Sequence, residues 1–255
     1  MSSQSNPKRF RINSSRHLSS NFLSILCPRL CIVCERILPT DVNALYKNYL
    51  CQYCFQDLDR MDLPGESRKR VFDRAKKHFV GLVPFDDAFV GFQFHKQGKL
   101  QRVIHAFKYE GISGVAEAMG EVLAEMFIRE RMEDEQPVPY DSVVALPLHR
   151  LRQIERGYNQ AESIAVGVAR RFGLEVNELL YRTRYTETQT GFDAADRKRN
   201  MTDVFRIRSS QLAHKRVILV DDVLTTGSTL VSAAETLKKG GVEKVMIMTL
   251  ALAAE

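Results

Sequence analysis

Several features that would each point to a particular class of protein are missing from this sequence. It has no apolar run of the roughly 18–20 residues that a membrane-spanning helix requires, since the longest candidate, Val242 to Ala254, is interrupted by Glu243 and Lys244. No segment has the form of a secretory signal, with an apolar core and a cleavage site. The five cysteines are an odd number, which argues against a complete disulfide framework. We therefore expect no membrane insertion and a reducing, cytoplasmic setting.

The phosphate-binding loop of nucleotide-hydrolysing motors is missing too. Such proteins need the pattern G-x-x-x-x-G-K-[ST], whereas Gly98 and Lys99 are followed here by Leu100. An apolar strand that ends in Asp221 and Asp222 would otherwise be compatible with a motor of this kind. The missing loop argues against that interpretation.

The residues that are present indicate an α/β protein. Hydrophobic residues make up 44% and charged residues 27% of the 255, as in an ordinary globular protein. Short apolar runs predict strands, and apolar residues at helical spacing predict helices between them. The predicted strands are residues 85–94, 142–148, 216–220 and 244–252, and the predicted helices are residues 100–107, 115–126, 161–172 and 230–237. Strands that alternate with helices predict a mainly parallel sheet.

Composition divides the chain into four parts. Residues 1–20 contain no acidic residue and little apolar surface, which predicts a disordered tail, although an organellar transit peptide has a similar composition. We expect a cysteine-rich module over residues 21–62, a charged linker or solvated helix over residues 63–79, and the α/β domain over residues 80–255. The net charge of +6 permits contact with phosphate or nucleic acid, but a solvated basic surface explains it as well.

The most informative stretch is V-I-L-V-D-D-V-L-T-T-G-S-T, residues 217–229. An apolar strand delivers Asp221 and Asp222 to its carboxyl end, where open α/β sheets bind their ligands. The loop that follows can wrap a phosphate with its backbone N–H groups and the first turn of a helix, and Gly227 lets the backbone approach closely or adopt a positive φ. The carboxylates suit the hydroxyls of a sugar, with or without a divalent metal. The structural alternative is that a hydroxyl side chain only caps the helix and that the acids merely end the strand.

This stretch resembles the phosphoribosyl pyrophosphate (PRPP) motif of type I phosphoribosyltransferases. The resemblance implies that Asp221 and Asp222 hold the 2′- and 3′-hydroxyls of a ribose. It also implies that the 5-phosphate is bound by the residues of the loop, which are Thr225, Thr226, Gly227, Ser228 and Thr229.

A second stretch narrows the family. Residues 147–162, P-L-H-R-L-R-Q-I-E-R-G-Y-N-Q-A-E, are similar to the ComF pattern P-L-x-x-x-R-x-x-x-R-G-[FY]-N-Q-[AS]. Gln189, Arg197, Asn200 and Phe205 resemble the segment that follows in that family. The resemblance to the ComF family implies a type I phosphoribosyltransferase-like parallel sheet flanked by helices, with a small N-terminal zinc-ribbon-like module.

Arginines near these motifs suit an anionic leaving group, because guanidinium groups chelate phosphate oxygens and stay charged. In the resembling enzymes the loop after the first core strand holds pyrophosphate, so Arg152 and Arg156 are our candidates for that role. Arg197, in the long polar connection 181–200, is the candidate for a charge that reaches the site. For each arginine a solvated surface position is the alternative.

The resemblance also implies a reaction, the displacement of pyrophosphate from the anomeric carbon of the ribose. The transition state is cationic at the sugar and anionic at the leaving group, so cations matter more than a nucleophile. Asp221, Asp222 and Arg197 would be the catalytic residues, and Mg²⁺ would accompany PRPP.

Four of the five cysteines form two C-x2-C pairs, Cys31 with Cys34 and Cys51 with Cys54. The spacing between the pairs fits C-x2-C-x15–20-C-x2-C, the pattern of a structural zinc site, in which the ion supplies the folding energy that a small core lacks. A redox role would need a thioredoxin-like βαβ context, which is missing. Cys27, before the first pair, could compete as a ligand or be a spectator.

Two functions follow as hypotheses. The first is a PRPP-dependent phosphoribosyltransferase with an unidentified acceptor. The second is a non-catalytic accessory protein of transformation, because ComF-like proteins are linked to competence, the uptake and processing of single-stranded DNA. In the second case the partners would be single-stranded DNA and other competence proteins, and the pocket would bind a nucleotide, a DNA end or a partner.

Overall fold

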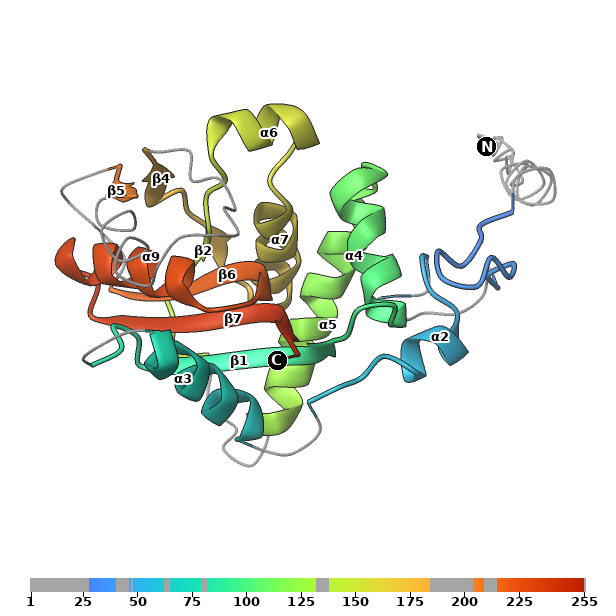
Figure 1. Cartoon of the computed structure of the whole chain (residues 1–255), viewed down its shortest axis with the longest axis horizontal. Helices are drawn as coiled ribbons and strands as arrows, with labels where there is room; N and C mark the ends of the chain where they lie inside the picture. Colours follow the sequence, from blue (N-terminus) through green and yellow to red (C-terminus); the bar gives the residue numbers. More distant parts are fainter. Residues whose placement is uncertain are drawn as a thin grey trace, which may run out of the picture.

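A five-stranded parallel sheet forms the centre of the molecule (Figure 1). The computed structural model describes residues 28–39, 46, 48–61, 65–78, 82–131, 138–183, 204–208 and 215–254. Across the sheet the strands follow the order β1 (Asp87–Phe94), β7 (Lys244–Ala253), β6 (Arg216–Leu224), β2 (Ser142–Ala145) and β3 (Glu175–Val176). Every neighbouring pair in this sheet is parallel. Two further strands, β4 (Leu180–Arg182) and β5 (Phe205–Ile207), pair with each other in antiparallel fashion.

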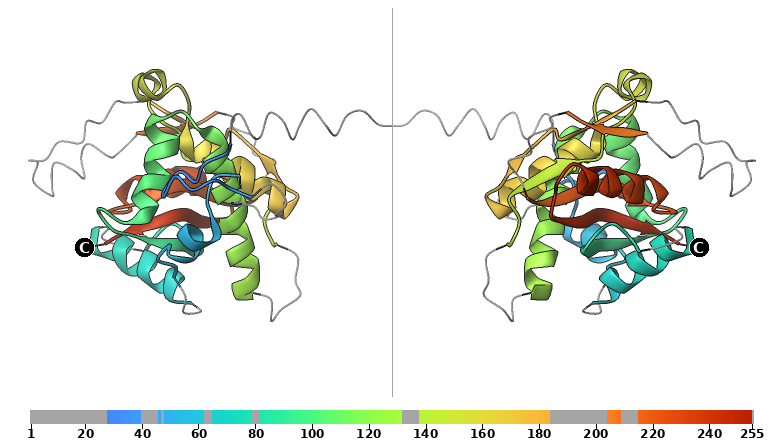
Figure 2. Two further views of the ribbon diagram at one scale, coloured as in Figure 1. Left: turned by 90° about the vertical axis from the view of Figure 1, so that its right-hand side faces the viewer. Right: turned by 90° about the vertical axis from the view of Figure 1, so that its left-hand side faces the viewer.

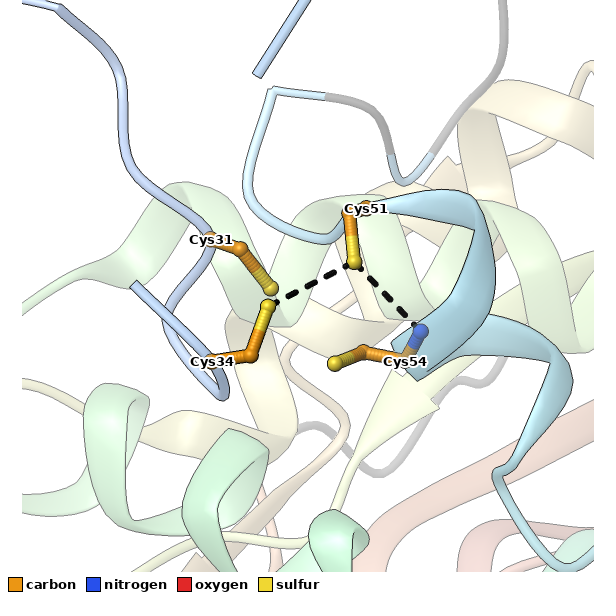
Figure 3. Close-up of side chains that lie close together, drawn as sticks. All are labelled: Cys31, Cys34, Cys51 and Cys54. Atoms are coloured by element: carbon orange, nitrogen blue, oxygen red, sulfur yellow. Dashed lines mark hydrogen bonds between the residues drawn. The ribbon is translucent and has the colours of Figure 1, made fainter. Parts of the chain in front are cut away.

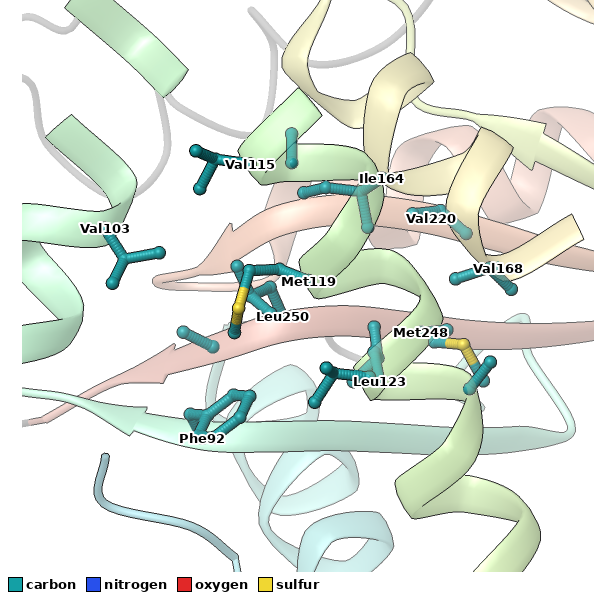
Figure 4. Close-up of a cluster of buried hydrophobic side chains, with 14 of the residues drawn as sticks. Phe92, Val103, Val115, Met119, Leu123, Ile164, Val168, Val220, Met248 and Leu250 are labelled. Atoms are coloured by element: carbon teal, nitrogen blue, oxygen red, sulfur yellow. The ribbon is translucent and has the colours of Figure 1, made fainter. Parts of the chain in front are cut away.

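Helices cover both faces of the sheet (Figure 1). One face packs against α4 (Lys99–Tyr109), α5 (Ser113–Arg131) and α7 (Gln160–Phe172), and the other packs against α3 (Glu66–His78) and α9 (Ser228–Lys239). Two short helices lie outside these layers, α2 (Gln52–Gln56) in the cysteine-rich segment and α6 (Arg150–Arg156) between β2 and α7. Figure 4 shows the core on the first face, where side chains of α5 and α7 point toward β6 and β7.

The predicted α/β class with a mainly parallel sheet is confirmed. Strands β6 and β7 are buried over most of their length, which explains why they appear in the sequence as nearly continuous apolar runs. None of the helices in the described ranges is long and apolar enough to cross a membrane.

Strand β6 is longer than the sequence predicted. It continues past Val220 to Leu224, because β7 also continues and pairs with it in register as far as Leu224 and Leu252. Asp221 therefore lies inside the paired part of the strand, opposite Thr249 of β7, and not beyond its end.

The segment expected as a linker or solvated helix, residues 63–79, contains α3. Ser67, Val71 and Ala75 are buried along one side of this helix, which packs against β1 and touches α9. The side chain of Arg74 reaches from α3 to the loop after β6. The expected tail, residues 1–20, lies outside the described residues, and the proposed domain boundaries remain predictions.

Candidate functional site

Asp221 and Asp222 lie near the end of β6 and face opposite sides of the sheet. Neighbouring side chains of a strand alternate between its two faces. Leu219 belongs to the core under α3 and α9, whereas Val220 belongs to the core under α5 and α7. By this alternation Asp221 is on the same face as Leu219, and Asp222 is on the same face as Val220. The two acids are adjacent in sequence but meet different parts of the protein.

Asp222 forms an ion pair with Lys108 at the end of α4. The Lys108 Nζ atom lies 2.5 Å from Asp222 Oδ2, and the two side chains are only 17% and 14% exposed. The other carboxylate oxygen, Oδ1, accepts a hydrogen bond from the backbone N–H of Val223 at 2.5 Å. Lys108 was not among the predicted site residues, because only the packing of α4 in the folded protein brings it next to β6.

Asp221 is the acid whose pKa the surrounding protein raises. Burial and then the negative charge of Asp222 raise its pKa to about 7, against the opposing effects of a hydrogen bond from the Asp222 N–H and of the charges of Lys108 and Arg182. On β7, the in-register neighbour Thr249 is fully buried, and within the described part of the chain its hydroxyl has no hydrogen-bond partner. In its protonated form Asp221 can donate as well as accept a hydrogen bond.

Arg182, the last residue of β4, adds a cation on the Asp221 side. Its guanidinium lies over the ring of Phe205 in β5, 5.7 Å from the ring centroid. Burial and then the positive charge of Arg152 lower the pKa of Arg182, and Asp221 opposes them. The charge of Arg152, a predicted site residue, thus acts on Arg182, which was not among the predicted site residues.

The loop after β6 has the geometry of an anion-binding turn. Gly227 has a φ of 78° and occupies the N-cap of α9, where it has no side chain to cap the helix. The hydroxyls of Thr226 and Ser228 lie 2.9 Å apart, and Thr229 follows in the first turn of α9. The exposed Thr225 is braced through its carbonyl oxygen, which accepts a hydrogen bond of 2.7 Å from Arg74 Nη1. The backbone N–H groups at the start of α9 are therefore held in a fixed turn.

The two predicted pyrophosphate-binding arginines both lie on α6. Arg152 and Arg156 are half-buried, and Arg156 Nη1 donates a hydrogen bond of 3.0 Å to Gln160 Oε1. His149 caps this helix, since its Nδ1 accepts a hydrogen bond from the Leu151 N–H. Arg197, the third predicted arginine, lies outside the described residues.

The turn between α6 and α7 connects three elements around the site. The Asn159 side chain accepts a hydrogen bond from the Ala161 N–H and donates one to the Leu146 carbonyl, so it caps α7 and ties it to the end of β2. The Tyr158 hydroxyl donates to the carbonyl oxygen of Phe107, the residue before Lys108.

A groove of about 380 Å³ adjoins this turn. Its lining residues are Gly111, Ser113, Glu117, Tyr158, Asn159, Glu162, Ser163 and Val166. The groove is thus bounded by the turn after α4, the start of α5 and the start of α7. The Tyr158 hydrogen bond ties the segment before α7 to the last turn of α4.

The four cysteines of the two C-x2-C pairs converge (Figure 3). Their sulfur atoms all lie within 4.8 Å of one another, and those of Cys34 and Cys51 are 3.6 Å apart. A tetrahedral ion bound at about 2.3 Å to each sulfur would separate its ligands by about 3.8 Å. The donor set and its spacing therefore fit a metal ion.

Helix α4 connects the cysteine cluster to the acid pair. Near its start, Arg102 Nε donates a hydrogen bond of 3.1 Å to the carbonyl oxygen of Ile32, which lies between the first two cysteines. Leu100, Val103 and the buried cysteines share one hydrophobic core. The left view of Figure 2 shows the cysteine-rich segment, in blue, beside α4. The end of the same helix carries Lys108.

Comparison with known proteins identifies relatives of this chain. A sequence-family model described as phosphoribosyl transferase domain matches residues 155–255. Competence protein F of Haemophilus influenzae is 32% identical over 157 residues, which cover 60% of this chain and 68% of that protein. DNA utilization protein YhgH of Escherichia coli (strain K12) is 32% identical over 152 residues, 59% of this chain and 66% of that protein. The chain thus spans about two thirds of the length of these relatives.

One solved structure with a partial match is glutamine phosphoribosylpyrophosphate (PRPP) amidotransferase from B. subtilis, complexed with ADP and GMP. It is 22% identical with a TM-score of 0.35, and the match covers 52% of this chain and 25% of that chain. The domain match and the parallel sheet flanked by helices confirm the predicted type I phosphoribosyltransferase-like fold.

Proposed function

Because this chain belongs to the ComF family of phosphoribosyltransferase-like proteins, we propose that the end of β6 and the loop after it bind a phosphorylated ribose, with PRPP as the ligand. One observation carries the proposal. The acid pair Asp221 and Asp222 is followed directly by a turn, residues 225–229, that leads into α9 and is held by a hydrogen bond from Arg74. Gly227 in the left-handed region opens that turn, and Arg74 holds its backbone. A helix start with no capping side chain favours an anion, whereas adjacent carboxylates favour hydroxyls.

The proposed roles follow the position of each group. The loop of residues 225–229 takes the 5-phosphate, and Asp221 and Asp222 take the ribose hydroxyls. Arg152 and Arg156 would hold the leaving pyrophosphate, which Mg²⁺ would accompany, and Arg197 would supply a further charge. If the site turns over, pyrophosphate leaves the anomeric carbon as an acceptor bonds to it, and the cations stabilise the negative charge on the leaving oxygens.

Calorimetry tests the binding of PRPP in the presence of Mg²⁺. At pH 8, where Asp221 is ionised, we expect saturable binding to the wild-type protein and a loss of more than about 10-fold in affinity in Asp221→Asn, because a hydrogen bond to a charged acceptor is removed. No heat with wild-type protein, or unchanged affinity in the variant, would refute the proposal. Release of pyrophosphate in the presence of candidate acceptors then separates an enzyme from a binding protein.

We also propose that the cysteine cluster holds a structural zinc ion in a reducing, cytoplasmic setting. Cys31, Cys34, Cys51 and Cys54 would be the ligands, and thiolate sulfur is a ligand that zinc prefers. Metal analysis of the purified protein should find one zinc ion per chain.

A role in the uptake or processing of DNA is the second candidate function. The relatives are named a competence protein and a DNA utilization protein. Helix α6 contributes no buried residue and combines arginines with exposed Leu151 and Ile154, at 52% and 69% exposure. The arginines of such a surface suit the phosphate backbone of single-stranded DNA. Binding that weakens steeply with salt is expected, and binding that does not respond to salt would contradict this role.

A further inference from the structure

The Lys108–Asp222 ion pair occupies a position that the proposed ligand needs. This inference rests on the proposed function, in which Asp222 receives a ribose hydroxyl. Asp222 Oδ1 already accepts the Val223 N–H, and Oδ2 is 2.5 Å from Lys108 Nζ. A sugar hydroxyl can therefore reach Oδ2 only if the ammonium group shares that oxygen or moves away from it.

A displaced Lys108 needs another anion. Its side chain is only 17% exposed, and leaving a buried charge without a counter-charge is strongly unfavourable. Glu110 is already bound by Arg102 at 2.8 Å and by His105 at 3.1 Å. Asp221, on whose pKa the charge of Lys108 acts, receives a ribose hydroxyl in the proposed function. The replacement anion is then best supplied by the ligand.

The other cations near the acids favour the same kind of ligand. The charge of Arg182 acts on Asp221, and Lys108 is paired with Asp222, so basic side chains from β4 and α4 accompany the two carboxyl groups. A ligand that carries a second anionic group near the acids would meet these cations. A ribose with a 5-phosphate alone places its anion in the loop after β6 and leaves the cations as they were.

We propose that Lys108 is a specificity-determining residue that exchanges Asp222 for an anionic group on the anomeric side of the bound ribose. The site then selects a ribose that carries a diphosphate at C1 over one that carries a 5-phosphate alone. In the ligand-free protein Lys108 balances the charge of Asp222, and in the complex it binds the diphosphate.

Affinities for PRPP and for ribose 5-phosphate, measured by calorimetry at constant Mg²⁺, test this exchange. For Lys108→Met we expect PRPP affinity to fall by about 10- to 100-fold, because one charge-assisted hydrogen bond is lost, while ribose 5-phosphate affinity changes by less than about 3-fold. Lys108→Arg should recover most of the PRPP affinity. Lys99→Met, which removes one lysine from the first turn of the same helix, should leave both affinities unchanged.

Three outcomes overturn the inference, and each has a separate meaning. An equal loss for both ligands would make Lys108 a structural residue, and no loss for either would exclude it from the site. If wild-type protein binds neither ligand, the proposed function fails and the exchange fails with it. Should Lys108→Met not fold, NMR of reductively methylated wild-type protein decides, with Lys108→Arg used to assign the signal. The Lys108 signal must then shift with PRPP and stay in place with ribose 5-phosphate.

Discussion

Each end of α4 lies beside a cluster of groups that can carry negative charge, and the two clusters differ in the cation that balances them. Beside its start, four thiols face one another with their sulfurs within 4.8 Å. Beside its end, two carboxyl groups face basic side chains, one of which, Lys108, forms a direct ion pair. The thiol cluster fits a cation that must come from solution, whereas the acid pair already has a cation from the chain. We infer that the first arrangement is built for permanent occupancy and the second for exchange.

The thiols of the cluster differ in their pKa values. Burial acts to raise the pKa of Cys31, but hydrogen bonds from the backbone of Cys51, Cys34 and Val33 lower it to about 7. Burial, followed by interactions with the neighbouring cysteines, raises the pKa of Cys54. A bound metal ion requires deprotonated sulfur, so the fully thiolate form of the cluster depends on the metal.

The largest effect is expected from breaking the cysteine cluster. Cys51→Ser should abolish stoichiometric metal binding and lower the melting temperature by more than about 10 °C, since structural zinc contributes directly to folding. The buried Cys31 and Cys54 share a core with α4, so the loss should extend beyond the module. Metal analysis and thermal unfolding measure both effects. Cys27→Ser is the matched control, and a full equivalent of tightly held metal in Cys51→Ser would contradict the assignment.

The next largest effect is expected from Asp222→Asn. The substitution leaves the Lys108 ammonium buried without its counter-charge, which should destabilise the protein by about 3–5 kcal/mol. Urea unfolding measures the change. The double variant Lys108→Met, Asp222→Asn should recover most of the stability, because no isolated charge remains. A double variant as unstable as the single one would show that the ion pair is not the cause.

A smaller effect, with a defined sign, is expected from pH. Burial raises the pKa of Asp221 to about 7 in the folded protein, above the ordinary value of 3.8. Between these two pH values the folded state holds a proton that the unfolded state has lost. The contribution of this group to stability therefore falls as pH rises from about 4 to about 7. Asp221→Asn removes this dependence, so its melting temperature relative to wild type should be higher at pH 8 than at pH 5, by at least about 2 °C. The opposite sign would indicate an ionised Asp221 at pH 5.

These predictions draw on residues that the sequence indicated to very different degrees. The strand, loop and helix from β6 to α9 are contiguous, so their order and the place of Gly227 could be predicted from local patterns alone. The converging cysteines could also be predicted, because the C-x2-C spacing limits where the thiols can point. The roles of these residues in binding remain predictions.

The partners that come from distant segments could not be predicted in this way. Lys108 reaches Asp222 only because α4 packs on the face of the sheet that Val220 shares, and no local pattern encodes that approach. Helix α3 did carry a signal, since Ser67, Val71 and Ala75 recur every four residues and are buried. The many basic residues of this helix made the segment resemble a solvated linker, so the four-residue spacing of the buried residues was not recognised in the sequence.

The smallest effect is expected at Lys99, the counterpart of Lys108 at the other end of α4. Lys99 forms an ion pair with Asp57, but these side chains are 40% and 63% exposed, so water solvates both charges after the pair is broken. Lys99→Met should therefore change the free energy of unfolding by less than about 1 kcal/mol, measured in the same urea experiment as Asp222→Asn. Both lysines are on one helix and each is paired with one aspartate, so burial is the main difference between them. If Lys99→Met destabilises the protein as much as Asp222→Asn does, burial does not set the strength of these pairs, and the contrast between the two ends of α4 must be given up.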